Sequence, residues 1–258
     1  MPTFADRYST KTWLGQGGMG DIWKCYDKDG VPFAVKTARD LGQSKVVQRE
    51  GEILERLKHP NIVRCGKVFY DSFEMHFMSG STLDEIMKDI GKMKERYAIE
   101  IIQLMCKAVN YSNNLGIIHR DIKPDNIFIT DTGEVKLFDF GIAIDRKRSR
   151  SHADPVNHVF EPLADPRLQD PNFVADAQVD VFALGVTLYK LVTGRNIMFG
   201  DRETILVQMK AHLDQVRPPS DFGVSKKLSD VIMKAISPAT FVRYESAAEL
   251  GKALAKAK

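Results

Sequence analysis

The sequence predicts an α+β protein in which strand-like segments come first and helical patterns dominate the rest. Up to about residue 77, strand-like runs and short turns fill most of the chain, with one main helical pattern among them. Later apolar residues recur mainly with helical spacing. The chain has 258 residues, of which 43% are hydrophobic, so it can bury a large core without disulfide or metal crosslinks.

The composition excludes several classes of protein. A net charge of +3 is small for this length, so we expect neither nucleic acid nor a membrane surface as the main partner. The three cysteines, Cys25, Cys65 and Cys106, lack metal-ligand spacing, and we expect them to be reduced and buried. The longest apolar stretch, residues 181–192, contains Lys190 and is too short to span a bilayer. No secretory signal opens the chain, so we expect a cytoplasmic protein without a membrane segment.

A glycine-rich turn lies between the first two strand-like runs. Gly15, Gly17 and Gly20 form a Gly-x-Gly-x-x-Gly pattern, which lets backbone N–H groups approach a phosphate without side-chain obstruction. A dinucleotide site would need a helix after these glycines. The chain instead continues as a strand-like run over residues 21–26 and a turn over 27–30. The pattern therefore predicts a glycine-rich loop between antiparallel strands.

A third strand-like run, residues 31–36, ends in Lys36 and precedes a helical pattern over residues 44–58. Taken alone, Lys36 would be interpreted as a solvated lysine on an edge strand. Glu50 lies on the helix, ten residues before Pro60. Gly51 follows it inside the helix, where glycine costs about 1 kcal/mol against alanine, and we interpret it as a sign of a mobile helix.

The later elements begin and end at residues with known capping preferences. Thr82 and Glu85 form a capping box before one helix, and Gly116 is placed to stop another. Strand-like runs are expected at residues 65–69 and 72–76. Helical patterns are expected at residues 97–114, 204–213, 225–236 and 246–256.

Four polar side chains fall within nineteen residues of the central stretch. They are Asp121, Lys123, Asn126 and Asp139. The strand-like runs between them are joined by a tight turn at residues 131–133, so a hairpin can bring both acidic ends to one site. Two carboxylates, an amide oxygen and a lysine suit a divalent metal that carries phosphates, and Mg²⁺ prefers such oxygen ligands.

The central stretch resembles the catalytic core of protein kinases. It reads His-Arg-Asp-Ile-Lys-Pro-Asp-Asn from residue 119 and Asp-Phe-Gly from residue 139. The resemblance to a protein kinase domain extends over residues 8–256. Lys-Pro shortly after the aspartate is typical of the serine/threonine branch of the family. The resemblance implies one bilobal domain over residues 1–258, with ATP in the cleft and no regulatory domain. It implies an antiparallel β-sheet lobe with one main helix at about 1–77, a hinge at about 76–81 and a larger, mostly helical lobe at about 82–258.

The resemblance also implies a role for each polar residue. Asp121 would accept the proton of a protein hydroxyl and position it, and Lys123 would neutralise the γ-phosphate. Lys36, paired with Glu50, would contact the α- and β-phosphates. Mg²⁺, or Mn²⁺ in its place, would be held by Asn126 and Asp139. The residues expected to contact ATP are Gly15, Gln16, Gly17, Gly18, Gly20, Ile22, Ala34, Lys36, Met75, His76, Met78 and Phe128.

Two further residues of the resemblance have structural roles. His119 is expected to pack beneath Phe140 rather than to act in catalysis. Asp180, near the start of a buried helix that ends at residues 193–194, is expected to accept backbone N–H groups of the catalytic loop.

A basic segment at residues 146–151 follows the Asp-Phe-Gly motif. Its resting state is expected to be a solvated, mobile loop. In the family, an arginine at the position of Arg120 pairs with a phosphorylated residue of this segment. Ser149 and Ser151 carry the only hydroxyl groups between Gly141 and Arg167, so we hypothesise that one is phosphorylated, which adds a charge of about −1.5 to −2.

The chain departs from the family pattern at residues 159–167. The threonine, tyrosine and glutamate usual there are missing, and that glutamate normally pairs with a late arginine, here Arg243. Arg167 would repel Arg243 unless Glu161 or Asp165 substitutes.

The expected function is autophosphorylating protein kinase activity. Two alternatives stay open, a nucleotide-binding pseudokinase that acts as a scaffold and a kinase of a non-protein acceptor.

Overall fold

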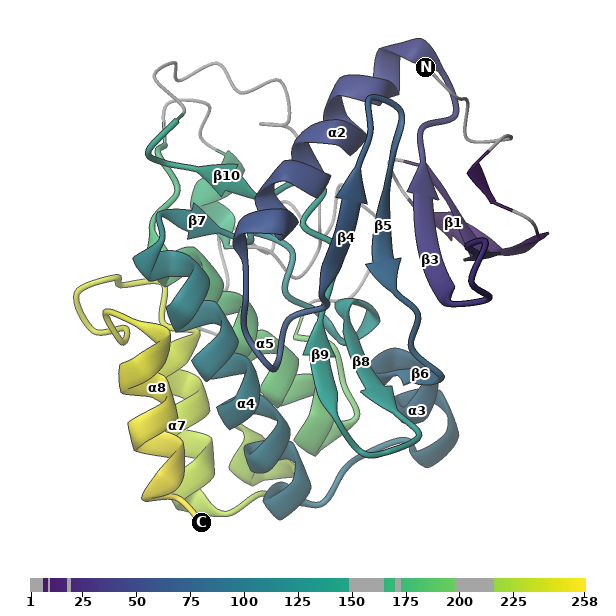
Figure 1. Cartoon of the computed structure of the whole chain (residues 1–258). Coiled ribbons are helices and arrows are strands. Elements are labelled where there is room, and N and C mark those ends of the chain that lie inside the picture. Colours follow the sequence, from purple (N-terminus) through teal and green to yellow (C-terminus); the bar gives the residue numbers. More distant parts are fainter. Residues whose placement is uncertain (1–6, 9, 18–19, 149–164, 170–172, 198–215) are drawn as a thin grey trace.

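The N-terminal part of the chain folds into an antiparallel sheet with one main helix against it (Figure 1). The computed structural model describes residues 7–8, 10–17, 20–148, 165–169, 173–197 and 216–258. The elements are β1 (Thr10–Gly17), β2 (Gly20–Tyr26), β3 (Pro32–Thr37), α2 (Leu41–Arg56), β4 (Cys65–Val68) and β5 (Ser72–His76). The five strands lie in the order β1-β2-β3-β5-β4, and α2 packs on β4 and β5. Lys36 lies opposite Ile22 of β2 and Phe73 of β5.

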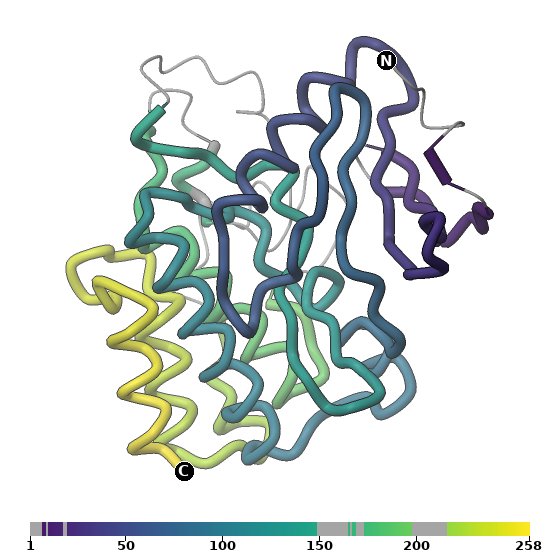
Figure 2. The backbone as a smooth tube through the Cα atoms, in the orientation of Figure 1, coloured from purple at the N-terminus to yellow at the C-terminus, as the bar shows by residue number. Residues whose placement is uncertain are grey.

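The rest of the described chain is mainly helical and lies below and to the left of this sheet in Figure 2. Its helices are α3 (Leu83–Ile90), α4 (Glu95–Asn114), α5 (Ala177–Thr193), α7 (Lys226–Ala235) and α8 (Ala247–Ala255), with 3-10 turns η1 (Pro124–Asn126), η2 (Pro166–Gln169) and η4 (Pro219–Phe222). Its strands are β6 (Gly80–Thr82), β7 (Ile117–Ile118), β8 (Ile127–Thr130), β9 (Val135–Leu137) and β10 (Ile144–Asp145). β6, β8 and β9 form a three-stranded sheet, and β7 pairs with β10. The expected hairpin is present, with Gly133 at φ +82° in its turn.

The observed helix boundaries coincide with capping residues more closely than with the ends of the apolar pattern. α2 begins three residues earlier than predicted because the Asp40 side chain accepts the N–H of Gln43. The capping box of Thr82 and Glu85 is confirmed at the start of α3. α4 ends as predicted, with Gly116 at φ +86°, a conformation that favours glycine. The helix expected at residues 204–213 lies outside the described residues.

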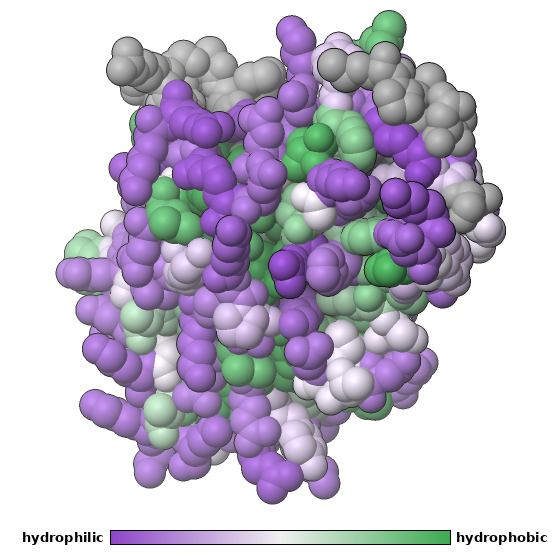
Figure 3. All heavy atoms as spheres, in the orientation of Figure 1, coloured by the Kyte–Doolittle hydropathy of each residue, from purple (hydrophilic) through white to green (hydrophobic). Residues whose placement is uncertain are grey.

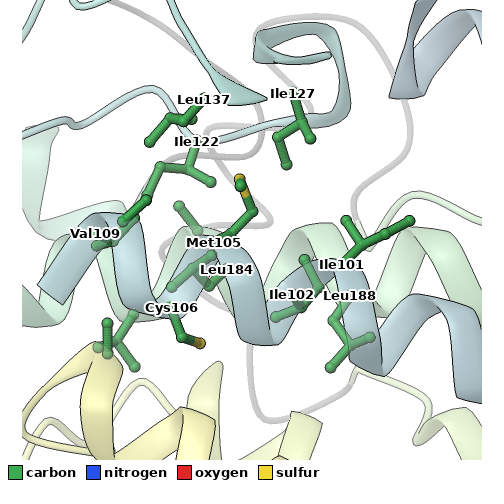
Figure 4. Close-up of a cluster of buried hydrophobic side chains, with 14 of the residues drawn as sticks. Ile101, Ile102, Met105, Cys106, Val109, Ile122, Ile127, Leu137, Leu184 and Leu188 are labelled. Atoms are coloured by element: carbon green, nitrogen blue, oxygen red, sulfur yellow. The ribbon is translucent and has the colours of Figure 1, made fainter. Parts of the chain in front are cut away.

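The buried centre of the helical part anchors the central stretch of the sequence. α4 packs against α5 and α8, and α5 packs against α7. Figure 4 shows the α4 side chains Met105 and Val109 close to Leu137 and to Ile122 and Ile127, which flank the polar residues of the central stretch. Both isoleucines are almost fully buried, so this stretch is fixed by apolar packing on either side.

On the face shown in Figure 3, hydrophilic side chains cover most of the surface and hydrophobic areas are smaller. Cys25 and Cys106 are buried as expected, but the expectation for Cys65 was wrong, because it is partly exposed on β4, the edge strand of the sheet. Within the described ranges, no helix is long and apolar enough to cross a membrane.

Asp165 supplies the carboxylate that the altered segment needs. The side chain of Asp165 is fully buried, and it pairs with Arg243 and with Arg167, the latter at 2.9 Å. Arg243 also donates to the carbonyl oxygens of Ser237 and Gln178. Asp165 therefore fills the role, and Arg167 joins the cluster instead of repelling it, while Glu161, the other substitute considered from the sequence, lies outside the described residues.

Gly51 has a packing reason that the sequence could not show. A Cβ atom on Gly51 would lie 2.9 Å from the Cβ of Phe73 and 2.9 Å from a methyl group of Val68. The glycine therefore allows α2 to approach β4 and β5 closely. The mobility inferred for this helix stays a prediction, and Gly51 alone no longer supports it.

We expect Gly51→Ala to destabilise the protein although alanine favours helices. The gain in helix propensity is about 1 kcal/mol, whereas overpacking costs about 1–3 kcal/mol, so the net loss should reach about 1 kcal/mol. Chemical denaturation measures it. Gly42→Ala, in the first turn of the same helix, is the control, because its Cβ would approach only the Asp40 carboxylate, at 3.1 Å, and no core side chain. A Gly51→Ala protein as stable as the control would contradict the close approach.

Asp165→Ala should lower the free energy of unfolding by about 3–5 kcal/mol, because it leaves the buried guanidinium of Arg243 without its carboxylate. Urea denaturation provides the measurement. Lys226→Ala removes one side of an exposed pair with Asp230 and should cost less than about 1 kcal/mol. Equal losses in the two variants would show that the Asp165 pair has no special weight.

Candidate active site

A cleft of about 420 Å³ lies where the N-terminal sheet meets the sheet of β6, β8 and β9. Most residues expected to contact ATP line it, namely Gly15, Gln16, Gly17, Ile22, Ala34, Lys36, Met75, His76, Met78 and Phe128. Gly20 does not line it, and Gly18 lies outside the described residues. The sequence analysis missed Leu14, Val63, Phe77, Thr82 and Phe138. Of these, Leu14 and Phe77 adjoin predicted contacts, so the motif neighbourhood could have indicated them.

Lys36 forms a buried ion-paired cluster with two carboxylates. Its ammonium lies 2.7 Å from Glu50 and 3.0 Å from Asp139. Burial alone would lower the pKa of Lys36, but the attraction of Glu50 and Asp139 is greater in sum and raises it above its ordinary value. Burial would likewise raise the pKa of Asp139, but Lys36 holds it below its usual range. The predicted Lys36–Glu50 pair is present, and it extends to Asp139.

A second polar cluster lies on the catalytic stretch. The amide nitrogen of Asn126 donates to the carbonyl oxygen and to a carboxylate oxygen of Asp121, each at 2.8 Å. Lys123 lies 3.0 Å from the other carboxylate oxygen of Asp121. Pro124 opens the 3-10 turn that carries Asn126, where a fixed φ is favourable. The four polar residues identified in the sequence therefore form two neighbouring clusters.

Two non-glycine residues of the site have left-handed backbone conformations. Arg120 has φ +68° and Asp139 has φ +59°. Such conformations cost about 1–3 kcal/mol each and persist only where the surroundings enforce them. For Arg120 the constraint is the fully buried carboxylate of Asp180, which accepts the backbone N–H groups of His119 and Arg120 at 3.0 and 2.9 Å. Burial raises the pKa of Asp180, although these donors favour its charged form.

His119 links the two clusters as a neutral imidazole. Its Nδ1 accepts the backbone N–H of Asp121 at 3.2 Å, so Nε2 carries the proton and donates to the carbonyl oxygen of Phe138 at 3.2 Å. Burial lowers the pKa of His119, which is consistent with the neutral form. The ring packs on fully buried Phe140, with centroids 4.4 Å apart, as expected from the sequence.

An ion pair ties the end of α2 to the segment after Asp139. Arg56, in the last turn of α2, pairs with Asp145 on β10. Arg56 holds the pKa of Asp145 below its usual range, although burial opposes this shift. Glu50, through Lys36, and Arg56 thus link α2 to both ends of the segment from Asp139 to Asp145. The sequence analysis missed this pair because no motif contains it.

The predicted regulatory residues are only partly described. Arg120 is buried, and its Nε donates to the carbonyl oxygen of Ile142 at 2.7 Å. Ser149 and Ser151 lie outside the described residues, so their phosphorylation stays a hypothesis.

Comparison with known proteins identifies the family. A sequence model described as protein kinase domain matches residues 8–250. The chain is 33% identical over 273 residues to the serine/threonine-protein kinase PknB of Mycobacterium leprae, covering 96% of this chain and 42% of that protein. It is 32% identical over 269 residues to a probable serine/threonine-protein kinase of Clostridium perfringens, covering 98% of this chain and 38% of that protein.

A solved structure agrees with these relatives. The crystal structure of Rad53 kinase domain and SCD2 matches with a TM-score of 0.73 and 25% identity, covering 93% of this chain and 85% of that one. The chain belongs to the protein kinase family. The relatives named above are serine/threonine-protein kinases, so the predicted family and bilobal fold are confirmed. The chain spans about 42% of the length of the PknB relative from M. leprae.

We expect Arg56 and Asp145 to be energetically coupled. Arg56→Met and Asp145→Asn should each destabilise the protein, and the double variant should lose less than the sum by about 1–2 kcal/mol, as contacting residues do. Denaturation of the four proteins measures this coupling. The exposed pair Arg217–Asp221 is the matched control and should couple by less than about 0.5 kcal/mol. Additive losses at Arg56 and Asp145 would mean that the pair does not join α2 to β10.

Proposed function

We propose that this chain is an ATP-dependent serine/threonine protein kinase that uses Mg²⁺, or Mn²⁺ in its place, to transfer the γ-phosphate to a protein hydroxyl. One observation carries the proposal: ion-paired Lys36, Glu50 and Asp139 line the same cleft as Asn126, which is hydrogen-bonded to Asp121. Phosphoryl transfer needs positioning and charge stabilisation more than covalent help from the protein. Membership of the kinase family supports this assignment.

The nucleotide would be held by groups already fixed in place. Lys36 is charged and aimed by Glu50, so it would contact the α- and β-phosphates. A divalent cation would neutralise charge on the transferring phosphate. Among the residues that the structure describes, no group of three or more His, Cys, Asp or Glu side chains is placed to hold a metal. Asp139, the amide oxygen of Asn126 and phosphate oxygens would therefore be its ligands, which suits a cation that keeps few protein ligands.

Asp121 and Lys123 would act on the transferred group. Asn126 fixes the Asp121 carboxylate by its hydrogen bond, so the carboxylate is oriented before an acceptor arrives. Asp121 would position the acceptor hydroxyl and take its proton. Lys123 lies 3.0 Å from this carboxylate, and its ammonium would neutralise charge on the γ-phosphate once ATP is bound.

The remaining expectations belong to the same proposal. The two lobes of one kinase domain would meet at a hinge near residues 76–81, where the backbone of His76 and Met78 would bind the adenine. Arg120 would hold a phosphate on Ser149 or Ser151 after autophosphorylation. The kinase would act in the cytoplasm on protein rather than nucleic acid.

The altered segment at residues 159–167 motivated two alternatives, a scaffold and a kinase of a non-protein acceptor. The pair between Asp165 and Arg243 weakens the case for a scaffold, because Asp165 gives the late arginine a buried carboxylate partner in place of the missing glutamate. The acceptor class is decided by experiment.

We expect the intact chain to transfer labelled γ-phosphate from ATP in the presence of Mg²⁺. Asp121→Asn and Asp139→Asn should each lower the initial rate by at least about a hundredfold. Asp230→Asn, an exposed carboxylate on α7, is the matched control and should leave the rate unchanged. The acceptors are the chain itself, a generic basic protein and a panel of small hydroxyl compounds, and the labelled residues are mapped.

The outcomes separate the three functions. Labelled protein supports the proposal, and label on Ser149 or Ser151 supports autophosphorylation of this segment. Label on small molecules alone identifies the non-protein alternative. Bound ATP without any transfer indicates a scaffold.

A further inference from the structure

Arg39 holds both sides of the glycine-rich loop from outside the cleft. It follows β3 by two residues, and its Nη2 donates to the carbonyl oxygen of Gly17 at 2.5 Å and to that of Gly20 at 3.3 Å. Its Nε donates to the carboxylate of Asp21 at 3.1 Å. With its amide oxygen toward Arg39, the Gln16 side chain accepts a further bond from Nη1 at 3.3 Å. One guanidinium therefore joins the end of β1 to the start of β2.

These contacts suit an arginine specifically. A guanidinium offers five N–H donors in a rigid planar fork, and charge-assisted hydrogen bonds are stronger than neutral ones. Lysine has the same charge but presents it as a compact point on a flexible stem. Four acceptors spread over Gln16, Gly17, Gly20 and Asp21 therefore require the fork as well as the charge. We call these four residues the loop flanks.

The base of the loop is closely packed around the same position. A Cβ atom on Gly20 would lie 2.3 Å from the carbonyl oxygen of Thr37, so only glycine allows this approach. The Trp23 indole N–H donates to the Thr37 hydroxyl at 3.2 Å. Arg39 thus extends from a segment that is already fixed against the start of β2. Its four bonds transmit that rigidity to the loop flanks.

We propose that Arg39 is a positioning residue that pre-orders the glycine-rich loop for the phosphate groups of the nucleotide. The inference rests on the proposed function, because it assumes that the cleft binds ATP. Glycine loses more conformational freedom on ordering than any other residue. If an untethered glycine-rich loop became ordered only on binding, that entropy cost would lower its affinity for phosphate. Fixing the carbonyl groups of Gly17 and Gly20 removes part of that cost before binding.

Arg39 has an electrostatic effect as well. The Asp21 carboxylate lies beside the loop flanks and would repel an incoming phosphate if it were unpaired. The ion pair with Arg39 neutralises it. Both effects act on the phosphate chain and not on the base. Arg39 should therefore raise the affinity for ATP and leave the affinity for adenosine nearly unchanged.

The test compares the binding of ATP, ADP and adenosine by calorimetry, in the presence of Mg²⁺. Arg39→Ala should weaken ATP binding about tenfold, which corresponds to about 1.4 kcal/mol, and should change adenosine binding less than about twofold. Arg39→Lys keeps the charge and the fold but loses the fork, so ATP affinity should still fall about fivefold. Lys28→Ala removes an exposed cation from the turn between β2 and β3, and both affinities should stay unchanged.

Three results would overturn the inference. ATP affinity in Arg39→Ala equal to that of the intact chain would show that the contacts do not serve the nucleotide. Full recovery in Arg39→Lys, or equal losses for ATP and adenosine, would show that charge or general stability is responsible rather than the fork. Failure of the intact chain to bind any of the three ligands would instead reject the proposed function, and the inference with it.

Discussion

The cleft depends on one buried ammonium shared by two carboxylates. Lys36 comes from β3, Glu50 from α2 and Asp139 from the segment after β9, so the cluster joins three elements far apart in the sequence. A buried charge is costly unless it is paired. Displacing either carboxylate would therefore leave the desolvation of the Lys36 ammonium less compensated and destabilise the fold. The backbone reinforces the link, because Asn61 and Val63, a few residues after α2, exchange backbone hydrogen bonds with Leu137 of β9. The position of α2 and that of Asp139 are therefore physically coupled.

Below this cluster, order is imposed by the interior of the helical part. Asp180 binds the backbone at His119 and Arg120, and the neutral His119 ring bonds to Asp121 and to the carbonyl group beside Asp139. Two left-handed residues are stable here because these bonds leave the backbone no relaxed alternative. The catalytic geometry is thus a property of buried groups that need not touch a substrate.

Local patterns predicted what is local, and tertiary contacts decided the rest. The capping box at Thr82, the hairpin turn at Gly133 and the helix stop at Gly116 depend on neighbouring residues, so the sequence was sufficient for them. The family motifs located the polar residues of the cleft. Gly51 was interpreted through helix propensity alone, because the contact with Phe73 is invisible in one dimension. The bonds from Arg39 and Arg56 were missed for the same reason, since their partners lie 18 to 89 residues away.

The packing around Ile122 and Ile127 has a consequence for how the molecule comes apart. These side chains bind the catalytic stretch to the best-buried helices, whereas the glycine-rich strands β1 and β2 lie at one edge of the sheet with Trp13 and Leu14 largely exposed. Regions with few buried contacts open first when a protein is warmed or strained. β1 and β2 would thus loosen while the catalytic stretch remains folded. A nucleotide in contact with both sides of the cleft would therefore stabilise β1 and β2 against this local opening.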